Sequence, residues 1–223
     1  MITVHHLNNS RSQRVLWLLE ELGLEYDIKR YQRNPATMLA PPELRKVHPL
    51  GKSPVITDDD LTIAESGAII EYLVGRHGNG RLVPSPDSPE RLRYTYWMHF
   101  AEGSAMPPLL LALIFGRLDK GKMPFFVRPI ARAIKNRVRQ SFIEPRINQQ
   151  LDFMEAELGK SAWFAGDEFS AADIQMSFPL EASVARGGLD SRCPRLMAFL
   201  QRIHERAAYK RALERGGEYQ LMK

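Results

Sequence analysis

Polar residues that could hold an anion follow the first apolar segment of the chain. Asn9 and Ser10 come shortly after residues 2–6, which have the pattern of a short strand, and they precede a helical pattern that ends near Gly23. The free N–H groups and the positive dipole end of such a helix favour a negative group such as a thiolate, to which the Ser10 hydroxyl could donate. Asn9 and Ser12 compete for this role, and from position alone an N-cap or turn role for Ser10 is the simpler interpretation.

Two further segments have residue types suited to binding an amino acid. Glu65 and Ser66 open a second helical pattern, where an N–H group and a hydroxyl could hold a carboxylate and Glu65 could pair with an ammonium. Pro54 stands at the start of a predicted strand, and a cis bond there would turn the backbone of Val55 toward a ligand that adds as an extra strand. The simpler alternatives are a helix cap and an ordinary edge proline.

A capping box is predicted before the third helical pattern of the second half of the chain. Ser170 is placed as the N-cap, Asp173 follows three residues later, and Phe169 and Ile174 are spaced as a hydrophobic staple. We therefore expect Ser170 and Asp173 to stabilise the fold and not to take part in catalysis.

The elements that must position these residues fall into two groups. The first group is β-α-β followed by β-β-α, with strands at residues 2–6, 26–31, 53–57 and 61–64. A proline-rich stretch at residues 83–89 then marks a linker. The second group is helical throughout, with bends or breaks expected at Pro107, Pro108 and Pro145 and helices predicted at residues 92–115, 126–158, 171–185, 194–206 and 209–215. The predicted units are residues 1–82 and 90–223.

Composition excludes several classes of protein. The 223 residues are 44% hydrophobic and carry a formal charge of +5, which is too little for a nucleic-acid-binding signature. A single cysteine, Cys193, rules out an intrachain disulfide, and the start of the chain lacks the pattern of a secretory signal. The most apolar window, residues 106–115, is about half of a membrane span. We expect a cytoplasmic protein that binds neither membrane nor nucleic acid.

One basic stripe has two interpretations. Arg128, Arg132, Lys135 and Arg139 recur at helical spacing, beside an apolar set. Such a helix could contact anionic lipid or nucleic acid, but a solvated helix face is the simpler explanation. The six histidines lack the spacing of metal ligands relative to nearby carboxylates, so no metal site is predicted.

Taken together, four segments resemble the cytosolic glutathione transferases, and the resemblance extends over nearly the whole chain. The segments are Asn9-Ser10-Arg11-Ser12-Gln13-Arg14-Val15, Pro49-Leu50-Gly51-Lys52-Ser53-Pro54-Val55, Glu65-Ser66-Gly67-Ala68-Ile69 and Phe169-Ser170-Ala171-Ala172-Asp173. The resemblance implies a thioredoxin-like α/β domain, an all-helical C-terminal domain and a homodimer. It also implies a cis bond at Pro54.

The same resemblance implies roles for individual residues toward glutathione. Val55 would pair its backbone with the cysteinyl unit, Glu65 and Ser66 would hold the γ-glutamyl end, and Lys52 would approach the glycyl carboxylate. His48 stands where the family often has Asn. The Ser10-x-x-x-Arg14 pattern is similar to the serine-type classes, so Ser10 is the predicted catalytic residue and Asn9 the second choice.

The implied function is detoxifying transfer of the glutathione thiolate to a hydrophobic electrophile, or its attack on a peroxide oxygen. A hydrogen bond donated to the thiolate would lower the pKa of the thiol. Two alternatives keep the fold: a binding protein without turnover, and a regulatory partner protein whose basic stripe contacts a polyanion. The sequence does not rank the electrophiles, and a redox role for Cys193 is disfavoured by its distance along the chain from these motifs.

Overall fold

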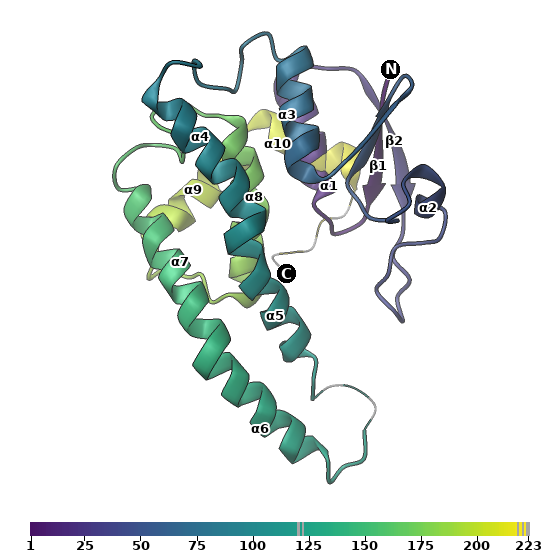
Figure 1. Cartoon of the computed structure of the whole chain (residues 1–223), viewed down its shortest axis with the longest axis vertical. Helices are drawn as coiled ribbons and strands as arrows, with labels where there is room; N and C mark the ends of the chain where they lie inside the picture. The colour runs from purple at the N-terminus through teal and green to yellow at the C-terminus, as the bar shows by residue number, and fades with distance from the viewer. Residues whose placement is uncertain (120, 122, 218, 220, 222–223) are drawn as a thin grey trace.

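The computed structural model describes residues 1–119, 121, 123–217, 219 and 221, and it has two units (Figure 1). The first unit is a four-stranded sheet in the order β2-β1-β3-β4. Strand β1 is parallel to β2 and antiparallel to β3, and β3 forms a hairpin with β4. The strands are β1 (Ile2–Leu7), β2 (Tyr26–Tyr31), β3 (Val55–Asp58) and β4 (Leu61–Ala64). All four predicted strands are confirmed to within a few residues.

Helices cover both faces of this sheet because β1 alternates its side chains between them. Ile2 and Val4 belong to the main core, which includes α1 (Ser12–Leu22) and α3 (Ser66–His77). Leu7 packs in a separate small cluster with Leu44 of α2 (Leu44–Val47). The sequence pattern missed α2, since four residues after two prolines are too short to show helical periodicity.

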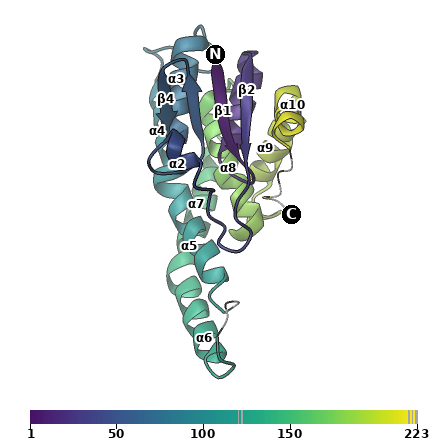
Figure 2. The ribbon, with the colours of Figure 1, turned by 90° about the vertical axis from the view of Figure 1, so that its right-hand side faces the viewer.

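The second unit is helical, and α8 runs through its centre (Figures 1 and 2). Residues 78–88 connect it to the sheet unit. Its elements are α4 (Pro89–Phe100), η1 (Ala101–Ala105), α5 (Met106–Gly116), α6 (Arg128–Val138), η2 (Arg139–Ile143), α7 (Glu144–Glu157), α8 (Ala171–Arg186), α9 (Pro194–Glu205) and α10 (Ala207–Gly216). Together the two units give the fold class that the sequence predicted, an α/β sheet domain plus an all-helical domain.

The prolines inside the long helices do not break them. Two π-turns, η1 and η2, immediately precede the segments that contain Pro107 and Pro145, and each closes with a bond from residue i+5 back to residue i. A π-turn shifts the hydrogen-bond pattern by one residue, so the helix continues past residues that have no N–H to donate. Bends or breaks were expected at these prolines; no break occurs, and a π-turn precedes Pro107 and Pro145 within each continuous helix.

One helix is long and apolar enough to cross a membrane by length and composition alone. It is the continuous run Pro89–Gly116, 28 residues with a mean hydropathy of 1.3 in its most apolar window, of which 39% is buried in the protein. Trp97, Met98 and Leu109 of this run belong to the main core. Length and composition do not separate a spanning helix from the core helix of a folded domain, and here these residues pack as core.

The capping box at the start of α8 is confirmed, and it reaches further than a local cap. Asp173 is fully buried, and its Oδ2 accepts the backbone N–H of Ser170 at 2.8 Å and the Ser170 hydroxyl at 3.1 Å. Its Oδ1 accepts the N–H of Phe164 at 2.9 Å. Burial raises the pKa of Asp173 to about 6, against the effect of these three donors. The carboxyl group thus ties the preceding loop to the helix.

We predict that Asp173→Ala lowers the free energy of unfolding by about 3 kcal/mol, because it removes the cap and leaves two buried N–H groups without an acceptor. Ser88→Ala supplies the control: Ser88 is the N-cap of α4, and its hydroxyl has no hydrogen-bond partner among the described residues. Urea denaturation of the two variants checks this, and equal losses would contradict it.

Candidate active site

A cleft of about 310 Å³ lies between the two units. Four of the residues predicted to contact glutathione line it: Lys52, Pro54, Glu65 and Ser66. The helical unit contributes Glu102 and Leu110, and the remaining lining residues are Arg11, His48, Leu50, Ser53 and Ala64. The sequence motifs from the first unit are therefore brought together at one opening, as expected.

The backbone around Pro54 brings Ser53 and Pro54 to the cleft. The Ser53–Pro54 bond is cis, as the resemblance implied. The Ser53 hydroxyl donates to the backbone carbonyl of His5 at 2.9 Å. Val55 is fully buried at the start of β3, where it pairs with His5 on one side and with Ala64 on the other. Of the two residues that flank Pro54, Ser53 lines the cleft and Val55 does not.

Glu65 and Ser66 reach the cleft from the start of α3. Glu65 has φ 71°, a backbone conformation that costs an L residue about 1–3 kcal/mol and tends to be kept at functional sites. This bend places exposed Glu65 just before the helix and puts Ser66 at its first position, where N–H groups have no partner within the helix. The pair therefore offers a carboxylate, a hydroxyl and free amides at one helix N-terminus.

Ser10 lies in the turn between β1 and α1 but is only 3% exposed, and it is absent from the cleft lining, as is Asn9. The Ser10 Oγ is 2.7 Å from the Ser12 Oγ and accepts the Ser12 N–H at 3.3 Å. Asn9 is half-buried in a left-handed conformation with φ 50°. Arg11, the residue after Ser10, does line the cleft.

A chain of hydroxyls continues from Ser10 to a buried histidine. The Ser12 Oγ lies 2.9 Å from Nδ1 of His6 on β1. Burial, aided by Arg30, lowers the pKa of His6 to about 4, so the imidazole is neutral at physiological pH. Because β1 alternates, His5 faces the opposite side of the sheet, where its Nδ1 lies 2.9 Å from the Tyr31 hydroxyl.

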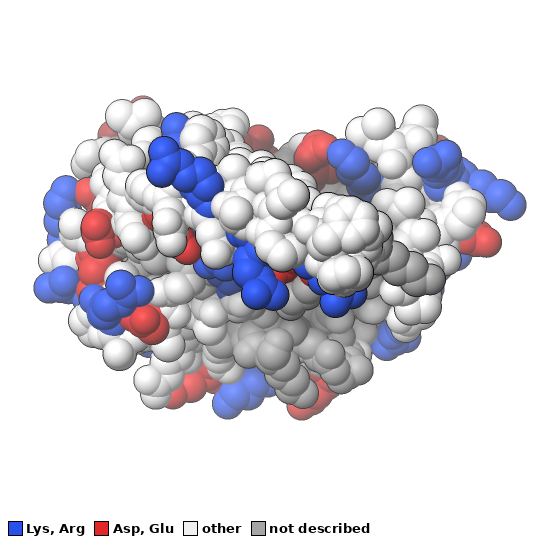
Figure 3. All heavy atoms as spheres, turned by 90° about the horizontal axis from the view of Figure 1, so that it is seen from below, with Lys and Arg blue, Asp and Glu red and all other residues white. Residues whose placement is uncertain are grey.

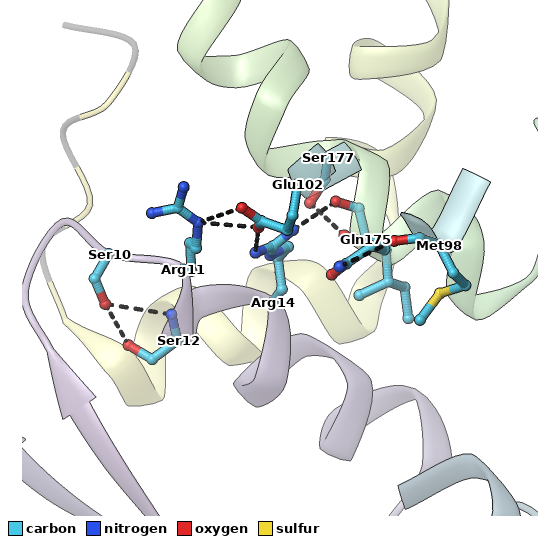
Figure 4. A network of polar contacts seen from close by, with 9 residues as sticks. Ser10, Arg11, Ser12, Arg14, Met98, Glu102, Gln175 and Ser177 are labelled. Atoms are coloured by element: carbon cyan, nitrogen blue, oxygen red, sulfur yellow. Dashed lines mark hydrogen bonds and ion pairs between the residues drawn. The ribbon is translucent and has the colours of Figure 1, made fainter. Parts of the chain in front are cut away.

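Arg14 joins the two units beneath the cleft (Figure 4). It is 1% exposed, and it donates to Glu102 Oε1 and to the Gln175 carbonyl, each at 2.6 Å. Arg11 Nε also donates to Glu102, at 2.9 Å from Oε1 and 3.0 Å from Oε2. Burial tends to raise the pKa of Glu102, but the charges of Arg14 and Arg11 outweigh it and hold that pKa below its usual value.

Sequence reasoning missed Arg11, Ser53 and Glu102 as cleft residues. Two of them had a signal: Ser53 directly precedes Pro54, and Glu102 is the one Asp, Glu, Lys or Arg between residues 94 and 116. A lone carboxylate in so apolar a helix needs a buried partner. Among the described residues, no group of three or more His, Cys, Asp or Glu is placed to hold a metal ion.

Comparison with known families matches both units. Residues 1–75 match the glutathione S-transferase N-terminal domain, and residues 123–207 match the glutathione S-transferase C-terminal domain. The chain belongs to the glutathione S-transferase family. It is 40% identical to "Glutathione S-transferase 3" of Schizosaccharomyces pombe, covering 82% of this chain and 74% of the relative. It is 34% identical to "Glutathione S-transferase 1" of Saccharomyces cerevisiae, covering 96% and 95%.

Solved structures agree with this assignment. A glutathione S-transferase from Actinobacillus pleuropneumoniae superposes with a TM-score of 0.83 at 32% identity, covering 100% of this chain and 96% of that one. The protein is a glutathione transferase with a thioredoxin-like domain, and glutathione is its co-substrate. These relatives are transferases by name, so the alternatives of a binding protein without turnover and of a regulatory partner are not favoured.

We predict that Glu102→Gln lowers the free energy of unfolding by about 2 kcal/mol. The change leaves the charge of Arg14 buried without a counter-ion, and the partial exposure of Glu102 reduces the usual cost of breaking a buried pair. Glu168→Gln is the control, because Glu168 is exposed and has no ion pair with any described residue. Chemical denaturation measures both, and an equally small effect of the two would contradict the role of Glu102.

His6 gives a second prediction, for acid stability. Its folded pKa of about 4 lies below the unfolded value of about 6.5, so the unfolded chain binds the proton first as the pH falls. Stability from this group is complete above pH ~6.5, and about 3 kcal/mol is lost as the pH falls to ~4.

The measurement is urea denaturation at several pH values across this window. His6→Asn should flatten the fall in stability, whereas His99→Asn, which removes an exposed histidine on α4, should leave it unchanged. The same pH slope in wild type and His6→Asn would show that His6 does not titrate in this way.

Proposed function

We propose that this glutathione transferase activates the thiol of glutathione beside the turn at Ser10 and transfers the thiolate to a hydrophobic electrophile or a peroxide. Ser10 would donate a hydrogen bond to the thiolate sulfur, with Asn9 as the alternative donor. The observation that carries this proposal is the pair of contacts that Ser12 makes with the Ser10 oxygen. If both Ser12 groups donate, the acceptor positions of Ser10 are filled and its own hydrogen remains for the thiolate.

The His6 tautomer would set the direction of this chain. With its proton on Nδ1, neutral His6 donates to the Ser12 Oγ, Ser12 donates to the Ser10 Oγ, and Ser10 donates onward. With the proton on the other nitrogen, Ser12 donates to His6 instead. We propose the first arrangement for the active enzyme, which makes Ser12 and His6 positioning residues.

The cleft would bind glutathione along its length. The γ-glutamyl ammonium would pair with Glu65, and the γ-glutamyl carboxylate would accept from Ser66 and the start of α3. Lys52 would approach the glycyl carboxylate. We place the backbone that pairs with the cysteinyl unit at Ser53 and not at Val55, because Val55 already has strand neighbours on both sides whereas Ser53 lines the cleft.

The electrophile would enter beside Leu110, the exposed apolar residue that the helical unit contributes to the cleft. The sulfur then forms a bond to carbon, and any leaving group departs with its electron pair. With a peroxide, the sulfur bonds to one oxygen while the O–O bond breaks and the other oxygen leaves with the electron pair; a second glutathione then attacks the oxidised sulfur to give the disulfide and water. We further propose a cytoplasmic homodimer that acts in detoxification, with the two domains divided at residues 83–89. The relatives named glutathione S-transferase and the cleft between the units support this description.

We predict that bound glutathione in the wild type has a thiol pKa lowered by at least about one unit, and that Ser10→Ala restores much of the ordinary value. Thiolate absorbance followed against pH measures it. Ser12→Ala should raise the thiol pKa by a smaller amount with unchanged glutathione affinity. Ser85→Ala, which removes an exposed serine outside the cleft, is the control.

Two results would overturn parts of this proposal. An unshifted thiol pKa in the wild type would exclude thiolate activation. A shift lost only in Asn9→Ala would move the donor role to Asn9.

A further inference from the structure

The helical unit has a projecting end that the cleft does not use. We call residues 117–139 the basic tip. They follow α5 and include α6 and the first residue of η2, and the part of this segment that the structure describes extends away from the body of the protein (Figures 1 and 2). Within α6 only Ala131 is buried. Most of the α6 surface is therefore open to solvent, and its composition bears on what it could contact.

Charge is concentrated in the basic tip. Its sequence holds eight Lys and Arg against one Asp, a formal +7, whereas the whole chain carries +5 and the remainder therefore −2. Asp119 takes up part of this charge, at 2.8 Å from Lys135 and 3.6 Å from Arg132, and Glu144 of α7 pairs with Arg139 at 3.0 Å. Arg128 and Arg137 are exposed and have no acidic partner among the described residues. The positive charge of these two arginines therefore faces solvent.

Large apolar side chains are exposed on the same segment. Phe125 is 83% exposed, Phe126 65%, Ile130 61% and Ile134 50%. Phe125 and Phe126 contact one another edge to face, at 5.6 Å between ring centroids. Four such residues close together in sequence are unusual on a protein surface and mark a place of contact with something apolar.

We propose that the basic tip binds the surface of a membrane that contains anionic lipids. Anionic headgroups attract Lys and Arg over about a Debye length, and exposed aromatic and aliphatic side chains enter the interface between headgroups and acyl chains. The two contributions together give stable peripheral binding where either alone is marginal. Seen end-on, Lys and Arg lie beside an uncharged area of the surface (Figure 3).

The chemistry of the tip favours a lipid surface over other partners. A symmetric contact with a second copy would place one +7 segment against another, and like charges at close range oppose it. Nucleic acid would use the arginines but would leave Ile130 and Ile134 without a partner. The tip is also a projection and not a groove, which suits a broad surface.

Co-sedimentation of the full-length protein with lipid vesicles tests the proposal. Binding is expected to vesicles that contain phosphatidylserine, to be much weaker for pure phosphatidylcholine, and to be lost near 1 M salt, where the Debye length is about 3 Å. No binding to phosphatidylserine vesicles at low salt would overturn the proposal.

Paired variants locate the binding surface. Arg128→Glu/Arg137→Glu and Phe125→Ala/Phe126→Ala should each weaken vesicle binding by about tenfold or more. Arg76→Glu/Lys210→Glu changes the net charge by the same amount at exposed positions outside the tip, and Leu39→Ala removes an exposed apolar residue elsewhere. Both controls should bind vesicles like the wild type.

The remaining outcomes are also decisive. If the tip variants and the controls lose vesicle binding equally, net charge alone explains the binding, and the assignment of the binding surface to the basic tip is wrong. If tip variants change the oligomeric state in size-exclusion chromatography, a second copy covers the tip and the proposal is wrong. Binding to duplex DNA that persists in Phe125→Ala/Phe126→Ala, without vesicle binding, would favour a polyanion. Glutathione-conjugating activity should be retained in every tip variant.

Discussion

The burial of one guanidinium determines how the two units meet. Arg14 lies on α1, which is packed against the sheet on one side and against helices of both units on the others. A charge withdrawn from water must be compensated at short range. Its compensation comes from Glu102 on η1 and from the Gln175 carbonyl on α8, so the two units are held in one relative position. The cleft lies at that junction, and its shape depends on the same contacts.

The cleft uses one helix N-terminus and a shared carboxylate. The turn before α3 brings free backbone donors to it, and the unusual backbone conformation of Glu65 is one that folding retains at a cost. Glu102 also holds Arg11 at the opening. Glu102, which compensates Arg14 below the cleft, therefore also orients Arg11 at the cleft opening. This shared ion pairing links the stability of the contact between the two units to the electrostatics of the cleft.

A single helical run connects the cleft to the projecting end of the protein. From Pro89 to Gly116 it contributes core residues, then Glu102, then the cleft residue Leu110, and its end leads into the basic tip. The π-turn η1 lets this run pass two prolines without a break. An apolar electrophile dissolved in a lipid surface would thus meet a protein in which the helical run that lines the cleft leads directly into the tip.

The local sequence pattern by itself predicted the succession of strands and helices along the chain, the capping box at Ser170 and Asp173, and the family motifs. It could do so because hydrophobic periodicity and helix caps are properties of neighbouring residues. Tertiary structure alone decided that Ser10 is buried against Ser12, that Ser53 and not Val55 lines the cleft, and that Arg14 pairs with Glu102. The partners in that ion pair are 88 residues apart, and their meeting depends on how whole helices pack. Burial, likewise, results from packing of the complete chain, so no spacing within a motif could have revealed it.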